Sequence, residues 1–132
     1  MQALELRSPV MERDMELIRH LLLFVEKDPR FDGTALQPLP IPHDFGEDRY
    51  TTAQVAYHVG LLIEAGFMKG AVNSMGPIVS RLTWDGHEFL ANIQNQDVWS
   101  RTKQKIEGLP GIALSVVAEI AKTEIKKKLG LM

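Results

Sequence analysis

Two polar side chains in the segment 52–65 could contact nucleic acid. Gln54 and Tyr57 are three residues apart, so on a helix they lie on the same face. A glutamine can pair with adenine in the major groove, and a tyrosine can reach a phosphate or stack on a base. The chemistry that this pair suggests is therefore noncovalent recognition of DNA.

The segment that must position these side chains has the pattern of a helix with one apolar face. Val55, Val59 and Leu62 recur at spacings of four and three, which predicts that they point inward. Thr51 or Thr52 is a natural N-cap for this helix. The outward face then carries a mixed set of residues, namely Gln54, Tyr57, His58, Leu61 and Glu64.

This outward face lacks the cations that hold DNA-binding proteins to the phosphate backbone. It has no Lys or Arg, and phosphates would repel Glu64. The nearest basic residues are Arg49, Lys69 and Arg81. Two interpretations stay open: a DNA-reading helix, or a packed helix whose outward face is solvated or binds another protein.

The histidines favour structural roles. His58 is either an outward DNA contact or a buried histidine that is hydrogen-bonded to backbone, and we favour the second interpretation. His20, His43 and His87 show no metal-ligand spacing such as HExxH. His43 and Asp44 could in principle bind a metal, but a turn is the better interpretation. We therefore expect no metal site.

The sequence contains no signature of an enzyme. Cysteine is absent, which excludes thiol nucleophiles, disulfides and thiolate metal sites. Glycine-rich phosphate loops and the GxSxG motif are also absent. Trp84 and Trp99 are expected to serve packing, with Trp84 sealing the hairpin against the core. We expect neither catalysis nor a cofactor.

Length and composition predict one domain, and its two halves differ in net charge. The chain has 132 residues, 45% of them apolar, which is enough for a core. Residues 1–66 hold 6 basic and 11 acidic side chains, a net charge of −5, whereas residues 67–132 hold 9 basic and 6 acidic, a net charge of +3. Any polyanion should therefore favour the second half. The lack of a secretory signal and of a long apolar run predicts a cytoplasmic protein without membrane contact.

The first third of the chain predicts a helix followed by an extended segment. Residues 1–10 carry no pattern and are expected to be a flexible lead-in. Residues 11–28, MERDMELIRHLLLFVEKD, place apolar residues every three or four positions, which is typical of a helix. The prolines of LQPLPIPHDFGED, residues 36–48, predict an edge strand or a polyproline-like arm.

The second half predicts a hairpin and three helices. The runs FMKGAV and PIVSRLTW flank a turn that contains Asn73 and Ser74, which is the pattern of a β-hairpin. The two turn residues could contact DNA weakly, but a plain turn is the better interpretation. Thr83 can cap the next helix, WDGHEFLANIQ. Two further helices follow, VWSRTKQKIEGL and a last helix that Pro110 can open.

The last helix is apolar on more than one side. Eight of the ten residues from Ile112 to Ala121 are apolar, and Leu114 points away from Val116 and Val117 at 100° per residue. A second copy of the chain is the simplest cover, with burial inside the monomer and binding to a membrane surface as alternatives. The expected homodimer interface consists of apolar residues only: Ile112, Leu114, Val116, Val117 and Ile120.

Several sequence motifs resemble those of the winged helix-turn-helix in arsenic-repressor-like and multidrug-resistance-repressor-like proteins. In these proteins a recognition helix ends in a phrase similar to HVGLLIEAGF, a wing hairpin follows, and an LT..G phrase opens the next helix. The resemblance implies an α+β fold with a winged-helix-like domain over residues 11–96 and C-terminal helices over residues 97–132. The matching residues are His58, Val59, Leu62, Ala65, Gly66, Phe67, Leu82, Thr83 and Gly86. Prolines occupy the segment where these repressors have the helix before the recognition helix.

A wider resemblance covers Met11 to about Leu129. MERDMELIRHLLLFVE, YHVGLLIEAGF, RLTWDGHEFLANI and VWSRTKQKI are similar to a family of short bacterial and prophage proteins of unknown function. This resemblance implies a fold and no activity.

Two functional hypotheses follow. The first is a small bacterial or prophage DNA-binding regulator that acts as a homodimer. Its DNA contacts would come from the predicted helix and hairpin: Gln54, Tyr57, His58, Leu61, Lys69, Asn73, Ser74 and Arg81. The alternative is a protein–protein interaction module that kept the winged fold, lost DNA binding, and binds a host or phage protein.

Overall fold

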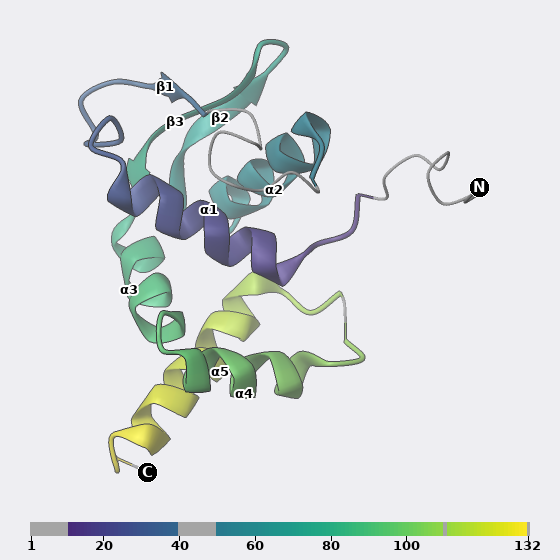
Figure 1. Cartoon of the computed structure of the whole chain (residues 1–132), viewed down its shortest axis with the longest axis vertical. Coiled ribbons are helices and arrows are strands. Elements are labelled where there is room, and N and C mark those ends of the chain that lie inside the picture. Colours follow the sequence, from purple (N-terminus) through teal and green to yellow (C-terminus); the bar gives the residue numbers. More distant parts are fainter. Residues whose placement is uncertain (1–10, 40–49, 110, 132) are drawn as a thin grey trace.

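The computed structural model describes residues 11–39, 50–109 and 111–131, which form five α-helices and one antiparallel sheet (Figure 1). The predicted lead-in, residues 1–10, lies outside the described residues. The elements follow one another as α1 (Met15–Lys27), β1 (Gln37–Pro38), α2 (Thr52–Glu64), β2 (Met68–Asn73), β3 (Gly76–Leu82), α3 (Trp84–Ile93), α4 (Gln96–Ile106) and α5 (Leu114–Lys128).

The sheet has the strand order β1-β3-β2. Strands β2 and β3 form the predicted hairpin, and its pairs run from Met68 opposite Leu82 to Asn73 opposite Gly76. Strand β1 pairs with β3 at the sheet edge, which is where a proline-containing strand is tolerated. The predicted edge strand is thus confirmed for 37–38, and residues 40–48 of the predicted arm lie outside the described residues.

Side chains cap four of the helices. The Thr51 hydroxyl of α2 accepts from the Gln54 amide while the Gln54 side chain accepts from the Thr51 amide, which makes a capping box. Thr83 caps α3 as predicted, because its hydroxyl accepts from the Gly86 amide at 3.0 Å. Asp14 and Asn95 cap α1 and α4 in the same way.

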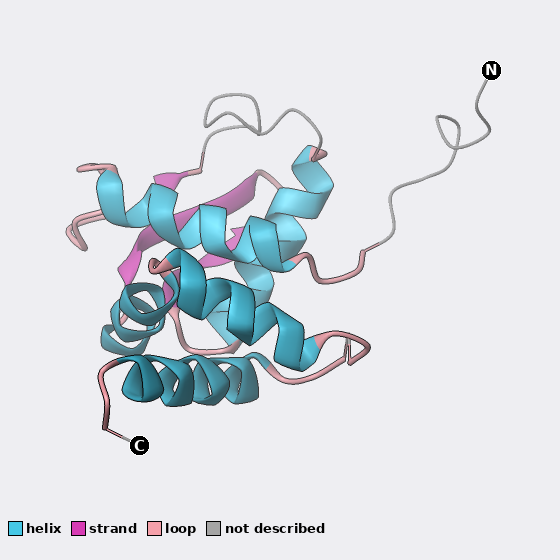
Figure 2. Ribbon diagram, turned by 60° about the horizontal axis from the view of Figure 1, so that its bottom comes forward, coloured by secondary structure: helices cyan, strands magenta, loops and turns pink. Residues whose placement is uncertain are grey.

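The core lies where α1 crosses the sheet, with α4 and α5 side by side beneath it (Figure 2). The inward stripe of α2 is confirmed, because Val55, Val59 and Leu62 are all buried. They meet the fully buried residues of α1, namely Leu17, Ile18, Leu21 and Leu22. Of the helices formed by the described residues, none combines the length and the apolarity that a membrane span requires.

Polar side-chain contacts connect α4 to α1. The Glu16 carboxylate of α1 accepts from the buried Trp99 indole at 3.1 Å and from the Lys103 ammonium. Partial burial works to raise the pKa of Glu16, but the hydrogen bonds from Lys103 and Trp99 outweigh it and lower the pKa. The Arg19 guanidinium lies 5.8 Å from the Trp99 ring centroid and donates to the Ile93 carbonyl at 3.1 Å. The predicted packing role of Trp99 is therefore confirmed, and the C-terminal helices share one core with the rest of the chain.

Trp84 does not seal the hairpin, and that prediction is wrong. It is the first residue of α3 and is 75% exposed. The Thr83 cap directs Phe89 and Leu90, and not Trp84, toward the core. Phe67 takes the expected place, because its ring packs on Phe89 with the centroids 5.0 Å apart.

Gly86 allows α3 to approach the backbone of Phe67, between α2 and β2, which predicts that Gly86→Ala is destabilising. A Cβ atom at this position would lie 2.0 Å from the Phe67 carbonyl oxygen. We expect a loss of about 2–3 kcal/mol in the free energy of unfolding, measured by urea denaturation.

Gly60→Ala is the matched control, because a Cβ there would meet only the Val72 side chain at 3.9 Å. Alanine also favours helix by up to about 1 kcal/mol over glycine. Equal stability of the two variants would contradict the close contact at Gly86.

Candidate interaction surface of helix α2 and the hairpin

The outward face of α2 is uncharged over most of its length. Tyr57 stands at its centre and is 41% exposed, as its spacing predicted. Ala53 is exposed and Gly60 is partly exposed on either side of it. Among the described residues of α2, the charged side chain is Glu64, which is exposed at the C-terminal end of the helix. The residues of α2 therefore offer DNA no cation, although the Arg13 guanidinium, which precedes α1, lies near enough to Tyr57 to interact with it by charge.

Gln54 and Leu61 are less available for recognition than their spacing suggested. The Gln54 side-chain oxygen accepts from the Thr51 amide at 2.8 Å, which engages half of the amide pair that would read an adenine. Leu61 is partly buried and packs on the core. Gln54 therefore stabilises the start of α2 and Leu61 stabilises its packing, which leaves less of both side chains for a DNA contact.

His58 is buried, which confirms the favoured interpretation of a buried histidine bonded to backbone and corrects its place among the DNA contacts. Its side chain is 1% exposed and lies between α2 and the start of α1. Nε2 accepts from the Asp14 amide at 2.7 Å, and Nδ1 lies 2.8 Å from the Gln54 carbonyl. Both bonds form when the ring is neutral and carries its proton on Nδ1. Burial lowers the pKa of His58, which keeps the ring in this state.

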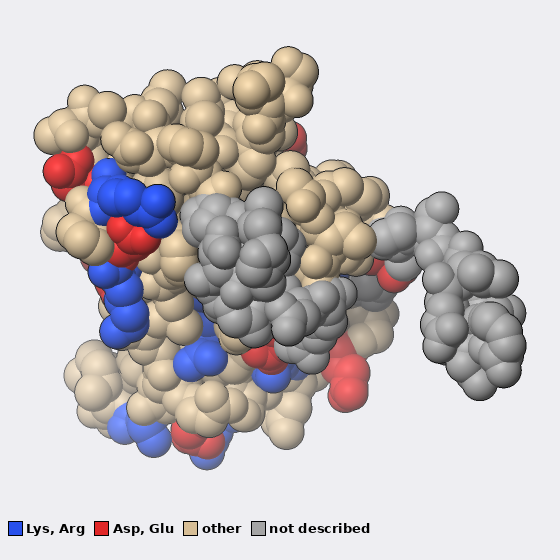
Figure 3. All heavy atoms as spheres, turned by 45° about the horizontal axis from the view of Figure 1, so that its top comes forward, with Lys and Arg blue, Asp and Glu red and all other residues tan. Residues whose placement is uncertain are grey.

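The hairpin tip is uncharged and partly apolar. Asn73 holds the turn, because its side-chain oxygen accepts from the Met75 amide at 2.8 Å. Ser74 is exposed, Met75 is 92% exposed, and Val72 is exposed on β2. At the top of Figure 3 the hairpin end of the molecule is tan, and Lys and Arg gather lower down.

The two hairpin cations lie at its base. Lys69 and Arg81 face each other across β2 and β3. Lys69 is four positions from Asn73 at the tip, a distance of about 13 Å along a strand. Arg81 donates to the Leu82 carbonyl at 2.8 Å, and its side chain packs close to Gly33. The predicted DNA contacts of the hairpin therefore lie at its two ends, with Lys69 and Arg81 at the base and Asn73 and Ser74 at the turn.

Helix α2 and strand β2 come close together at Gly60. Gly60 has no side chain, and the Val72 methyl group lies within 3.9 Å of the point that a Cβ atom at Gly60 would occupy. We name the α2–hairpin surface for the residues that compose it, namely Tyr57, Gly60, Leu61, Val72 and Met75. Its side chains are aromatic or aliphatic, with one thioether.

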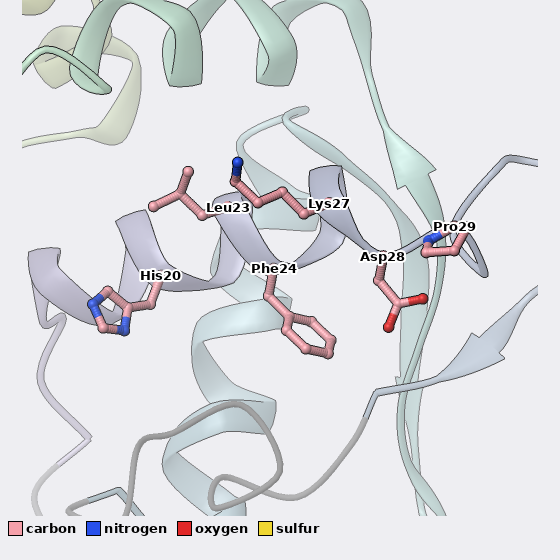
Figure 4. Close-up of a pocket in the computed structure, with 6 residues that line it drawn as sticks. All are labelled: His20, Leu23, Phe24, Lys27, Asp28 and Pro29. Carbon is pink, nitrogen blue, oxygen red and sulfur yellow. The ribbon is translucent and has the colours of Figure 1, made fainter.

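A hollow beside α1 brings no reactive groups together. It has a volume of about 560 Å³ and is lined by His20, Leu23, Phe24, Lys27, Asp28 and Pro29. In Figure 4, Leu23 and Lys27 project to one side of the helix, and Phe24 and Asp28 to the other. The Asp28 carboxylate pairs with the Arg30 guanidinium at 2.7 Å. Hydrogen bonds from the side chain and the backbone amide of Arg30 lower the pKa of Asp28. Across the described residues, no cluster of three or more His, Asp and Glu side chains could hold a metal ion.

The predicted dimer residues of α5 divide into two groups. Leu114 and Val117 are buried in the chain's own core, so their assignment to a dimer interface is corrected. Helices α3 and α4 both pack on α5 and cover two of its sides, which accounts for its broad apolar surface. Ile112 and Ile120 are partly buried, and Val116 is 43% exposed. Dimerisation through Val116 and its neighbours stays a prediction.

Sequence reasoning missed a buried carboxylate on α5. The buried stripe of this helix continues from Leu114 through Val117 and Ala121 to Glu124, whose side chain is 2% exposed. The spacing of three and four residues would have found it, because it places Glu124 directly below Ala121 on the inner face.

The arrangement defines an α+β domain in which a helix precedes a β-hairpin. Residues 12–113 match the family described as "Hypothetical protein (DUF2513)", and the chain belongs to this family. It is also similar to a Haemophilus influenzae protein named "Uncharacterized protein", with 32% identity over 124 residues that cover 90% of this chain and 99% of that protein. No solved structure matches the chain. The predicted membership of a family of unknown function is confirmed.

The buried neutral His58 predicts that stability falls in mild acid. Its pKa is lowered in the folded state, so below about pH 6.5 the unfolded chain binds the proton more readily. The free energy of unfolding should therefore be greatest above this pH and decrease as the pH falls toward the folded-state pKa. Urea denaturation between pH 8 and pH 5 measures this slope.

His58→Gln should remove this contribution to the pH dependence. His87→Gln changes an exposed ring and is the matched control, which keeps the slope. A His58→Gln protein with the wild-type pH dependence would contradict the role of His58.

Two neighbouring valines of α5 should respond differently to a charge. Val117→Glu places a carboxylate in the core, and we expect a loss of about 3 kcal/mol or more in the free energy of unfolding. Val116→Glu, on the exposed side, should change it by less than about 0.5 kcal/mol.

Light scattering of the Val116→Glu protein then tests the remaining dimer prediction. A fall from dimer to monomer mass would support an interface at Val116. A monomeric wild-type chain would refute it.

Proposed function

We propose that this chain is a protein-interaction module on a winged-helix scaffold, and that the α2–hairpin surface binds the partner. The scaffold assignment rests on the element order α1-β1-α2-β2-β3 and the strand order β1-β3-β2, with a helix placed before a wing-like hairpin. The function rests on one observation, which is that the exposed residues at the centre of α2 and at the hairpin tip are uncharged. The chain is not an enzyme in this proposal.

DNA recognition by this surface would lack its electrostatic basis. Phosphate contacts from Lys and Arg supply most of the affinity of DNA-binding proteins and fix their register on the duplex. On the described residues of α2 and the hairpin, Lys69 and Arg81 supply such charges, and both lie at the hairpin base. Glu64 opposes them at the end of α2.

Protein recognition fits the same residues better. Tyr57 combines an apolar ring with a hydroxyl group, which is the type of side chain that anchors protein interfaces. Met75 is flexible and polarisable, so it can adapt to the shape of a partner. We therefore expect a partner protein with an uncharged, partly apolar binding site, and an association that depends weakly on salt.

A DNA-binding regulator is the second candidate. It is favoured by the winged arrangement itself and by the positive charge of residues 67–132. As a homodimer it would match palindromic DNA sites. In this case the basic residues of α4 and α5 would have to contact DNA, because the centre of α2 has no cation.

Site-specific photo-crosslinking tests the proposed function. A photoreactive residue in place of the exposed Met75 should crosslink to a discrete protein in the native cell, and Tyr57→Asp should abolish the product. The same photoreactive residue at the exposed Glu119 of α5 is the control, and it should not give this product. Unchanged thermal melting of Tyr57→Asp excludes unfolding as the cause. A product that persists in Tyr57→Asp, or that arises equally from Glu119, would contradict the proposal.

A further inference from the structure

A second hollow lies between α4 and α5. It has a volume of about 510 Å³, which falls within the usual range for small-molecule sites. Its lining is strongly polar and consists of Arg101, Gln104, Lys105, Glu124 and Lys127. Nothing in the α2–hairpin surface contributes to it.

The base of this hollow is a buried carboxylate with an unfilled hydrogen-bonding capacity. The Glu124 side chain is 2% exposed, and its Oε2 atom accepts no hydrogen bond from the described residues. The ammonium groups of Lys105 and Lys127 lie 3.4 Å and 3.6 Å from Oε2 and pair with it by charge. Because buried carboxylates are normally hydrogen-bonded, Oε2 can accept one further O–H or N–H donor.

The rim of the hollow is positive. Arg101, Lys105 and Lys127 face the single carboxylate of Glu124, which leaves a net charge of +2 among the lining residues. All three cationic side chains are about half exposed, so they can turn toward a ligand and let it reach the carboxylate. Arg101 also contacts Asp97 at 3.4 Å, outside the hollow.

We infer that this hollow binds a small organic phosphate monoester. Its anionic oxygens would pair with the three cations, and its P–O–H group would donate to Glu124 Oε2. A monoester has a second pKa near 6 and so keeps this proton in part of the population near neutral pH. Hydrogen bonds from O–H to a carboxylate are among the strongest in proteins. A phosphodiester has no such proton, so this site differs from one that binds the DNA backbone.

Phenyl phosphate and phenyl sulfate are the probes for this site. At about pH 5, below the second pKa of a monoester, both carry mainly one negative charge and the same ring, but the sulfate ester has no O–H donor. In a titration followed by ¹H–¹⁵N NMR, phenyl phosphate should shift the α4 and α5 amides and bind at least about tenfold more tightly than phenyl sulfate. Equal affinities, or no shifts at about 10 mM phenyl phosphate, would overturn the inference.

Three variants separate the roles of the lining residues. Glu124→Gln should reduce the preference for phosphate over sulfate to about one, because the amide can donate to either ester. Arg101→Gln combined with Lys105→Gln should weaken phenyl phosphate binding at least about tenfold, and it leaves Lys127 as the charge partner of the buried Glu124 carboxylate. Lys126→Gln, on the exposed side of α5, is the control and keeps the affinity. Full affinity in the double variant would overturn the site even if Glu124→Gln failed to fold.

Discussion

The packing of α2 against α1 determines which chemistry this protein can present to its surroundings. Val55, Val59 and Leu62 are buried against the apolar face of α1, and His58 joins them through its bond to the Asp14 amide. Once these four residues are inside, the outer face of α2 is left with Tyr57 at its centre. Together with Val72 and Met75 of the hairpin, this aromatic side chain is what the α2–hairpin surface presents to a partner.

The fold was largely predictable from periodicity and capping residues, because these are local signals. The hairpin, the Thr51 and Thr83 caps and the inner stripe of α2 all follow from spacings of two to four residues. Burial against distant elements was harder to predict. Trp84 is exposed at the first position of α3 whereas Phe67 packs on Phe89, and Val117 is buried because α3 and α4 flank α5.

In the candidate sites too, features set by local spacing were predictable and features set by distant residues were not. Tyr57 could be placed outward from its spacing alone, whereas the capping bond of Gln54 and the neutral ring of His58 depend on Thr51 and Asp14. The hollow at Glu124 required knowledge that α4 brings Arg101 and Lys105 beside α5. The result is a molecule with an uncharged surface at the α2–hairpin end and a cationic hollow between its C-terminal helices.

NMR mapping with duplex DNA tests the central claim most directly. A random-sequence duplex is added to ¹⁵N-labelled protein at about 50 mM salt, where electrostatic binding to DNA is strong. The uncharged α2–hairpin surface predicts that the amides of Tyr57, Val72 and Met75 keep their positions. Salt-sensitive shifts that concentrate on these amides would contradict the account and favour the DNA-binding regulator.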